Sequence, residues 1–107
     1  MRYEIVLAPE AVDALKALPA RTRTTVRDAI ERHLRHEPRR TSKSRIKRLR
    51  GLERPQFRLR VDEIRVFYDV TTTTVEILAI ITKAEAQAWL DKQGTPTPPG
   101  SPSQGEG

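Results

Sequence analysis

The chain has 107 residues, of which 20 are Lys or Arg and 14 are Asp or Glu, so its formal net charge is +6. This length predicts one domain, and the lack of cysteine excludes a disulfide framework, a thiol nucleophile and a cysteine-ligated metal. The sequence has no run of about 18 apolar residues to span a membrane and no secretory signal at its start, so we expect a cytoplasmic protein with no membrane partner.

The N-terminal third predicts a strand and two helices. Apolar and polar side chains alternate over residues 2–7, which is the period of a half-buried strand. Apolar residues then recur at helical spacing between Pro9 and Pro19, and an apolar residue every four positions from Val26 predicts a second helix that closes near Pro38. The two helices are expected to form a helical hairpin.

A β-hairpin is predicted over residues 57–70, with its turn at residues 62–63. Apolar residues alternate with polar ones on both sides of that turn. A register that buries the apolar row places Arg58, Arg60 and Arg65 on one side of the sheet. Three guanidinium groups on one face repel each other unless an anion joins them.

The remaining segments predict a buried strand and a capped helix. Residues 75–81 are almost entirely apolar, which suits the most buried strand of a sheet. Thr82 and Glu85 fit a capping box at the start of a helix that runs to about Lys92, and Gly94 is placed to end it. A short C-terminal helix therefore follows the last strand.

Composition separates a folded domain, residues 1–93, from a tail, residues 94–107. The tail is rich in Pro, Gly and Ser and is expected to be disordered. For the domain, the order of elements predicts an α+β fold. Its sheet would be dominated by antiparallel pairs and have about four strands in the order β-α-α-β-β-β-α, with the two N-terminal helices packed on it and a short C-terminal helix.

Basic residues concentrate in the middle of the chain. Residues 39–65 hold eleven Lys or Arg and three acids, a local net charge of +8, whereas the other residues hold nine basic and eleven acidic side chains. The basicity is therefore a patch rather than a general property. Such a patch favours a polyanionic partner, with nucleic acid as the leading candidate.

The order of elements, together with three short motifs, resembles the RelE/ParE superfamily of bacterial type II toxin–antitoxin systems. The motifs are KRLRG at residues 47–51, FRLR at residues 57–60 and RVFY at residues 65–68, and the resemblance extends over residues 2–92. It implies a RelE-like fold and a small toxin that a cognate antitoxin neutralises in a tight heterocomplex.

The resemblance implies two activities that the shared scaffold does not separate. A RelE-like toxin enters the ribosome and cleaves mRNA without a metal or cofactor, and this ribosome-dependent endonuclease (mRNA interferase) is our leading hypothesis. A ParE-like toxin inhibits DNA gyrase without catalysis. A third reading is a degenerate toxin that only binds RNA or its antitoxin.

Candidate site residues follow from the chemistry of RNA transesterification, which needs a proton acceptor for the 2′-hydroxyl, cations for the phosphorane and a proton donor for the leaving 5′-oxygen. The resemblance assigns these tasks to Lys47, Arg60, Arg65 and Lys83. The candidate RNA-binding residues are Lys43, Arg45, Arg48, Arg50, Arg58 and Trp89.

Two of these assignments have plainer alternatives. Counted from Lys83, Trp89 occupies a position where many ribosome-dependent members have Tyr, and indole has no proton for acid–base work; core or partner packing is the commoner role. The hairpin arginines would be an ordinary solvated face if they formed salt bridges to the acids at positions 62, 63 and 69. We expect His33 to be structural or exposed, and Tyr68 to be a buried strand residue.

Overall fold

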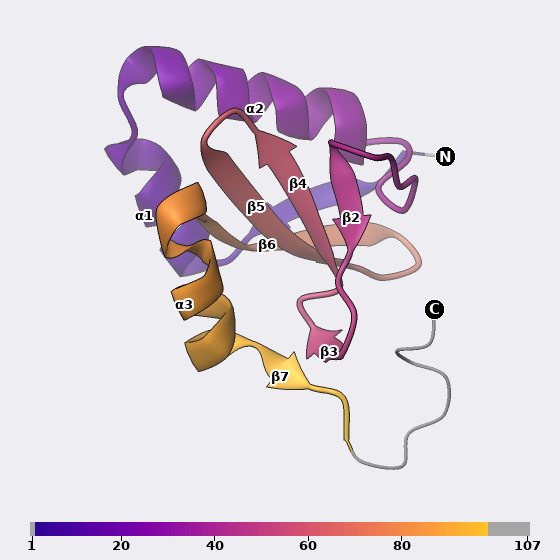
Figure 1. The fold of residues 1–107 in the computed structure, drawn as a ribbon. Helices are drawn as coiled ribbons and strands as arrows, with labels where there is room; N and C mark the ends of the chain where they lie inside the picture. Colours follow the sequence, from indigo (N-terminus) through magenta and orange to yellow (C-terminus); the bar gives the residue numbers. More distant parts are fainter. Residues whose placement is uncertain (1, 99–107) are drawn as a thin grey trace.

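The main sheet has five strands in the structure, a computed structural model that describes residues 2–98. They are β1 (Glu4–Leu7), β2 (Ile46–Arg48), β4 (Phe57–Val61), β5 (Ile64–Val70) and β6 (Thr74–Thr82). Figure 1 shows their spatial order, β1-β6-β5-β4-β2. β1 runs parallel to β6, and every other neighbouring pair is antiparallel. The expected α+β class and the dominance of antiparallel pairs are confirmed.

Two helices cover one face of this sheet, which we call the inner face. They are α1 (Pro9–Ala17) and α2 (Ala20–Leu34), and Figure 1 shows α2 running across one end of the strands. Val26 and Ile30 of α2 belong to one buried cluster with Leu59 and Val66 of the sheet. The apolar repeat of the second helix therefore faces the sheet, as its spacing predicted.

The hairpin of β4 and β5 has the predicted register. Leu59 pairs with Val66 on the inner face, whereas Arg60 pairs with Arg65 on the opposite, outer face. The turn is tight because Asp62 adopts φ 52°, a left-handed conformation that Asp tolerates better than most residues. The alternation in the sequence thus determines which side chains reach each face.

The prediction of about four strands was wrong, because the basic segment before the hairpin is not a plain loop. It contains β2, which pairs with β4, and β3 (Leu52–Arg54), which pairs with β7 (Thr95–Pro96) in a separate two-stranded sheet. Strands of three or two residues carry no readable alternation, and pairing with distant segments forms them. The second helix also ends at Leu34, earlier than the predicted end near Pro38.

The C-terminal helix α3 (Lys83–Gln93) begins and ends where the sequence predicts. The Thr82 hydroxyl accepts a hydrogen bond from the Glu85 amide (3.3 Å) and donates one to the Glu85 carboxylate (3.1 Å). Gly94 ends the helix with its amide on the Leu90 carbonyl (2.8 Å). Its φ of −70° is not left-handed, but a Cβ there would lie 2.6 Å from the Leu90 oxygen, so the close approach explains the glycine.

The segment predicted as a disordered tail, residues 94–107, has one short strand in its described part. Thr95 and Pro96 form β7, and the Thr97 amide donates to the Gly51 carbonyl (3.0 Å). Residues 99–107 lie outside the described part of the chain. Within residues 2–98, no helix has the length and apolar character needed to cross a membrane.

Candidate nucleic-acid interface

The outer face of the sheet gathers basic side chains from three adjacent strands. Lys47 of β2 lies directly opposite Arg58 of β4, and Arg60 of β4 lies opposite Arg65 of β5. Residues directly opposite in an antiparallel pair point to the same face. Four of the predicted site residues therefore share one surface, and Phe67, opposite Arg58, extends it toward α3.

These cations have no carboxylate partner within residues 2–98. No ion pair there involves Lys47, Arg58, Arg60 or Arg65. Burial lowers the pKa of the Arg58 guanidinium, and the charges of Arg65 and Arg60 lower it further. The Arg58 Nε is buried and has no hydrogen-bond partner. The outer face therefore holds closely spaced positive charge without an opposite charge within residues 2–98, an arrangement that favours an anionic ligand.

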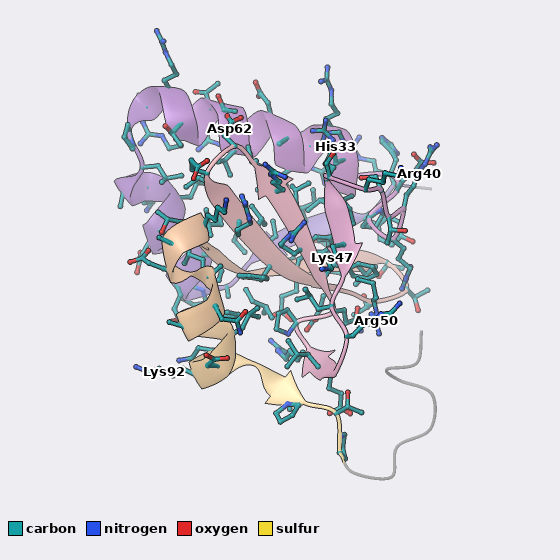
Figure 2. All side chains as sticks on the ribbon, viewed as in Figure 1. His33, Arg40, Lys47, Arg50, Asp62 and Lys92 are labelled. Atoms are coloured by element: carbon teal, nitrogen blue, oxygen red, sulfur yellow. The ribbon has the colours of Figure 1, made fainter. Side chains whose placement is uncertain are left out.

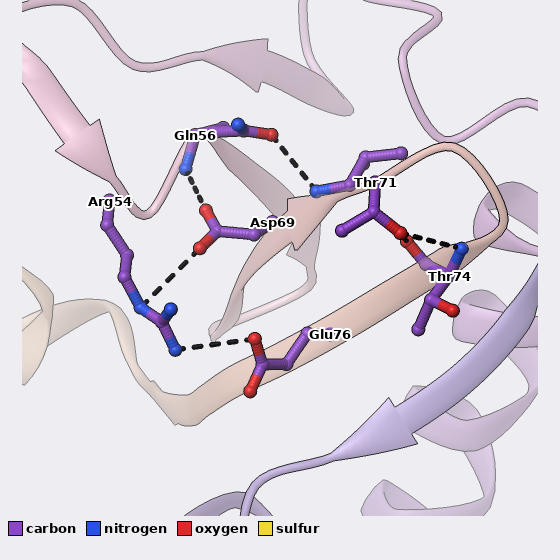
Figure 3. Close-up of polar contacts among 7 residues, drawn as sticks. Arg54, Gln56, Asp69, Thr71, Thr74 and Glu76 are labelled. Carbon is purple, nitrogen blue, oxygen red and sulfur yellow. Dashed lines mark hydrogen bonds and ion pairs between the residues drawn. The ribbon is translucent and has the colours of Figure 1, made fainter.

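Of the three acids expected to neutralise the hairpin arginines, Asp69 pairs with Arg54 instead, and neither the Asp62 nor the Glu63 carboxylate forms an ion pair within residues 2–98. Asp69 pairs with Arg54 (3.5 Å), and Arg54 also reaches Glu76 (3.3 Å), as Figure 3 shows. The Gln56 amide donates to Asp69 (2.7 Å), and the Gln56 side chain accepts from the Val70 amide (3.0 Å). This network joins the segment between β3 and β4 to the sheet.

Arg65 is the most enclosed of the four cations, with 6% of its surface exposed. Its Nη1 donates to the carbonyls of Asp62 (2.8 Å) and Ile64 (3.1 Å). Part of its donor set therefore holds the hairpin turn rather than facing a ligand. Its charge still acts on the outer face, because it lowers the pKa of Arg58 after the larger effect of burial.

α3 packs against β5 and β6, and its aromatic contact with the outer face is made by Trp89. The Trp89 ring stacks on Phe67, with ring centroids 5.2 Å apart and planes 3° apart. No residue of α3 is fully buried. One face of the indole is thus occupied by Phe67, which agrees with the packing role expected for Trp89. Only the part of the indole that Phe67 does not cover could contact RNA, as predicted for Trp89.

Lys83 begins α3 at the hairpin end of the outer face. Its amide donates to the Glu63 carbonyl (2.7 Å), and the preceding residue, Thr82, is opposite Ile64 of β5. The backbone thus brings Lys83 to the turn beside Arg60 and Arg65, and its side chain is exposed. The resemblance assigned a catalytic task to Lys83, and the structure places this residue where the last strand meets the hairpin turn.

Lys47 and Arg50 line a groove between the β2–β3 segment and α3. The groove has a volume of about 690 Å³, and Leu49, Leu52, Gln87, Leu90 and Asp91 complete its lining. Figure 2 shows Lys47 over β2 and Arg50 at the turn that follows it. Among the other predicted RNA-binding residues, Lys43 and Arg45 are exposed just before β2.

Arg48 does not share the outer face with the other candidates. It lies opposite Phe57, and its guanidinium stands over the Phe57 ring, 5.2 Å from the centroid. That ring belongs to the inner face, where it stacks on Tyr68 at 5.4 Å. Alternation along β2 thus places Lys47 and Arg48 on opposite sides of the sheet.

His33 was missed as a site candidate, although it lines a pocket with Arg45, Arg60 and Asp62. The pocket has a volume of about 650 Å³ at the edge where α2 meets the end of β4. Figure 2 labels His33 and Asp62, two of its lining residues. Burial lowers the pKa of His33, and the charges of Arg45 and Arg32 add to this effect. The available signal was its position three residues after the buried Ile30, which turns it toward the sheet.

Tyr68 is buried on the inner face, as expected. Its hydroxyl donates to the Pro38 carbonyl (2.7 Å), and burial raises its pKa. It therefore cannot serve proton transfer on the outer face. Within residues 2–98, no three His, Asp or Glu side chains cluster in a way that could hold a metal ion.

Comparison with known proteins gives matches only among solved structures. No protein-family model and no curated protein matches the chain. A chain of the RelB–RelE antitoxin–toxin complex from Methanococcus jannaschii superposes with a TM-score of 0.62 at 20% identity, covering 78% of this chain and 96% of that one.

Two further complexes give similar values. A chain of the RelBE2 toxin–antitoxin complex from Mycobacterium tuberculosis has a TM-score of 0.61 at 27% identity, covering 77% of this chain and 99% of that one. A chain of the archaeal RelE–RelB complex from Pyrococcus horikoshii has a TM-score of 0.59 at 26% identity, covering 78% and 97%. The protein therefore shares its fold with subunits of RelB–RelE antitoxin–toxin complexes.

Proposed function

We propose that this protein is the toxin of a type II toxin–antitoxin pair and acts as a RelE-like, ribosome-dependent mRNA endonuclease. The fold shared with subunits of RelB–RelE complexes supports the toxin–antitoxin part of the proposal. The observation that carries the activity is the outer face, where Arg58, Arg60 and Arg65 lie side by side with no carboxylate partner in the described chain.

The proposed reaction breaks one phosphodiester bond by an internal attack. The ribose 2′-oxygen attacks the adjacent phosphorus and loses its proton, the P–O5′ bond breaks, and the 5′-oxygen gains a proton. The products are a 2′,3′-cyclic phosphate and a 5′-hydroxyl, so no external reactant is consumed. The phosphorane between them carries an additional negative charge, which nearby cations stabilise more strongly than the ground state.

Each basic residue has one task in this scheme. Arg58 and Arg60 bind the non-bridging phosphate oxygens, and the enclosed charge of Arg65 adds to the field they create. Lys47, directly opposite Arg58, is placed to accept the 2′ proton. Lys83, brought to the hairpin turn by the start of α3, donates the proton to the leaving 5′-oxygen.

The proposed antitoxin would bind over the same side of the molecule. The groove of about 690 Å³ beside α3 combines apolar Leu49, Leu52 and Leu90 with basic Lys47 and Arg50. An acidic amphipathic segment fits such a lining, because its apolar side covers the leucines and its carboxylates neutralise the cations. Bound in this way, it would also block access of RNA to Lys47.

The test is cleavage of mRNA by the full-length protein on translating ribosomes, followed by mapping of new mRNA 5′ ends. We expect cuts with the wild type and a loss of about 10²-fold or more with Arg60→Gln, which removes an exposed cation from the outer face. Arg27→Gln removes the same charge from the exposed side of α2 and should cut normally. Intact transcripts alongside growth arrest would refute the endonuclease.

One observation favours a second candidate function, the ParE-like inhibition of DNA gyrase without catalysis. Trp89 has no titratable proton and is stacked on Phe67, so it does not supply the acid–base group that a tyrosine there would provide. A supercoiling assay with purified gyrase separates the two candidates. Inhibited supercoiling with intact mRNA would establish the gyrase activity, whereas the absence of both effects would identify a degenerate toxin.

A further inference from the structure

The edge strand β2 presents positive charge on both faces of the sheet. Lys47 points to the outer face opposite Arg58, and Arg48 points to the inner face opposite Phe57. Both side chains are exposed, and in the part of the chain that the structure describes no strand pairs with the free side of β2. A polyanion that reaches Lys47 therefore meets Arg48 as soon as it passes this edge.

A separate basic pocket lies on the inner side of that edge. It has a volume of about 420 Å³ and is lined by Arg39, Thr41, Arg48, Gln56, Phe57 and Val70. The lining contains two guanidinium groups and no carboxylate. Asp69, on the neighbouring strand, is already held by Arg54 (3.5 Å) and by the Gln56 amide (2.7 Å). The charge of Asp69 acts on Arg48 only after the larger effect of Arg54, so the pocket keeps a net positive charge.

Both arginines are held in position before any ligand binds. The Arg48 guanidinium rests over Phe57, whose ring stacks on Tyr68, and the Tyr68 hydroxyl is anchored on the Pro38 carbonyl at 2.7 Å. Arg39 donates to the Tyr3 hydroxyl (3.0 Å) and to the Thr71 carbonyl (3.3 Å). Preorganised cations lose little conformational entropy on binding, so this geometry favours an anionic ligand.

The chemistry of the pocket selects nucleic acid over a protein partner. The aromatic and aliphatic members, Phe57 and Val70, are only 5% and 6% exposed, so they offer little apolar surface to a peptide. The free face of the Arg48 guanidinium is a planar platform on which a base can stack. The Arg48 guanidinium donates no hydrogen bond within residues 2–98, so its N–H groups are available to phosphate.

We propose that Arg39 and Arg48 form a second subsite for single-stranded RNA, which continues from the outer face round the β2 edge into the inner-face pocket. The inference rests on the proposed RNA-directed function and adds that the protein binds longer RNA at a second position. A short RNA occupies the outer face alone. A longer strand also places a phosphate and a base at Arg48.

The experiment measures binding of the full-length protein, free of any partner, to 2′-O-methyl RNAs, which cannot undergo attack by the 2′-oxygen. Oligonucleotides of about 4 and about 12 nucleotides cover the usual range of single-strand sites. We expect Arg48→Gln to weaken binding of the longer RNA by about tenfold, through the lost stacking and phosphate contact. The slope of the logarithm of the binding constant against the logarithm of the salt concentration should become shallower by about 0.7, the value for one phosphate contact.

Three controls make the result specific. Arg48→Gln should leave the affinity for the short RNA unchanged, and Arg27→Gln, on the exposed side of α2, should leave both affinities unchanged. Arg48→Lys keeps the charge but not the planar group, so it should retain the salt slope and lose part of the affinity. Thermal melting of each variant checks that the fold is retained.

The outcomes separate this subsite from the proposed function itself. Tight binding of both RNAs with no effect of Arg48→Gln overturns the subsite and leaves the endonuclease proposal standing. Failure of the wild-type protein to bind either RNA overturns the subsite, whereas the endonuclease is tested separately by cleavage on translating ribosomes. A loss of antitoxin affinity in Arg48→Gln with unchanged RNA affinity assigns the pocket to the protein partner and overturns the RNA subsite.

Discussion

The two faces of the sheet are built from alternate residues of the same strands, yet they are opposite in character. On the inner face, Leu59, Val66 and Tyr68 are fully buried beneath α1, α2 and the segment after α2. On the outer face, Arg58 has a buried nitrogen without a partner, and α3 contributes no fully buried residue. The inner face thus supplies stability, whereas the outer face keeps an unfavourable charge arrangement, as binding sites often do.

The largest effect should come from deleting apolar volume on the inner face. Leu59→Ala removes a fully buried side chain of the main cluster. We expect the free energy of unfolding to fall by about 2–5 kcal/mol, from lost burial and the cavity left behind. Val6→Ala is the matched control, because Val6 is 44% exposed and should cost far less. Equal losses in urea unfolding would show that the inner face does not dominate stability.

On the outer face, stability and function should move in opposite directions. Arg58→Met removes the buried unpaired Nε and its repulsion with Arg60 and Arg65. Because a buried unsatisfied donor costs about 1–3 kcal/mol, we expect the free energy of unfolding to rise by about 1 kcal/mol. mRNA cleavage should fall by about 10²-fold or more through loss of phosphate stabilisation.

Arg27→Met, on the exposed side of α2, controls for the change of residue type. It should alter neither cleavage nor unfolding beyond the small range of surface substitutions. A drop in stability of Arg58→Met would mean that Arg58 has a structural role, and the contrast between the two faces would then be wrong at this position.

The same contrast explains how much the sequence predicted. Regular alternation over residues 57–70 was sufficient to predict the hairpin register and the shared face of Arg58, Arg60 and Arg65. β2, β3 and β7 have three or two residues each and exist only through pairing with distant segments, so local pattern could not reveal them. The helices and the Thr82 cap were readable because their signals are local.

Site geometry was harder to predict than fold, because it depends on contacts between distant residues. The enclosure of Arg65 and the capture of Asp69 by Arg54 arise from tertiary packing. The face on which Arg48 lies could not be predicted, because it follows from the pairing of β2 with β4. His33 was overlooked because one histidine beside a buried stripe has several ordinary explanations, and only the folded chain places it in the same pocket as Arg60.

α3 should be the least stable element that touches the outer face. Trp89→Ala removes its stacking on Phe67, a contact worth about 0.5–1.5 kcal/mol beyond the area buried. We expect faster amide hydrogen exchange throughout α3 with little change in α2, since α3 has no fully buried residue. Lys92→Ala, exposed on the same helix, is the control. Loss of protection in α2 as well would show that the two faces unfold together.

The smallest expected effect concerns His33, which lies where the two faces meet at Arg60. Burial, aided by Arg45 and Arg32, lowers its pKa in the fold below the usual value of about 6.5 in the unfolded chain. As pH falls through that value, the unfolded chain takes up a proton that the fold resists, so the free energy of unfolding should decrease and then level off below the folded pKa. His33→Gln should therefore lose less stability than the wild type between about pH 7.5 and 5.5.

A phosphate bound at Arg45 and Arg60 offsets the positive charge that opposes protonation, so RNA should raise the pKa of His33, measurable by NMR titration. Identical titrations with and without RNA would place the phosphate away from this junction.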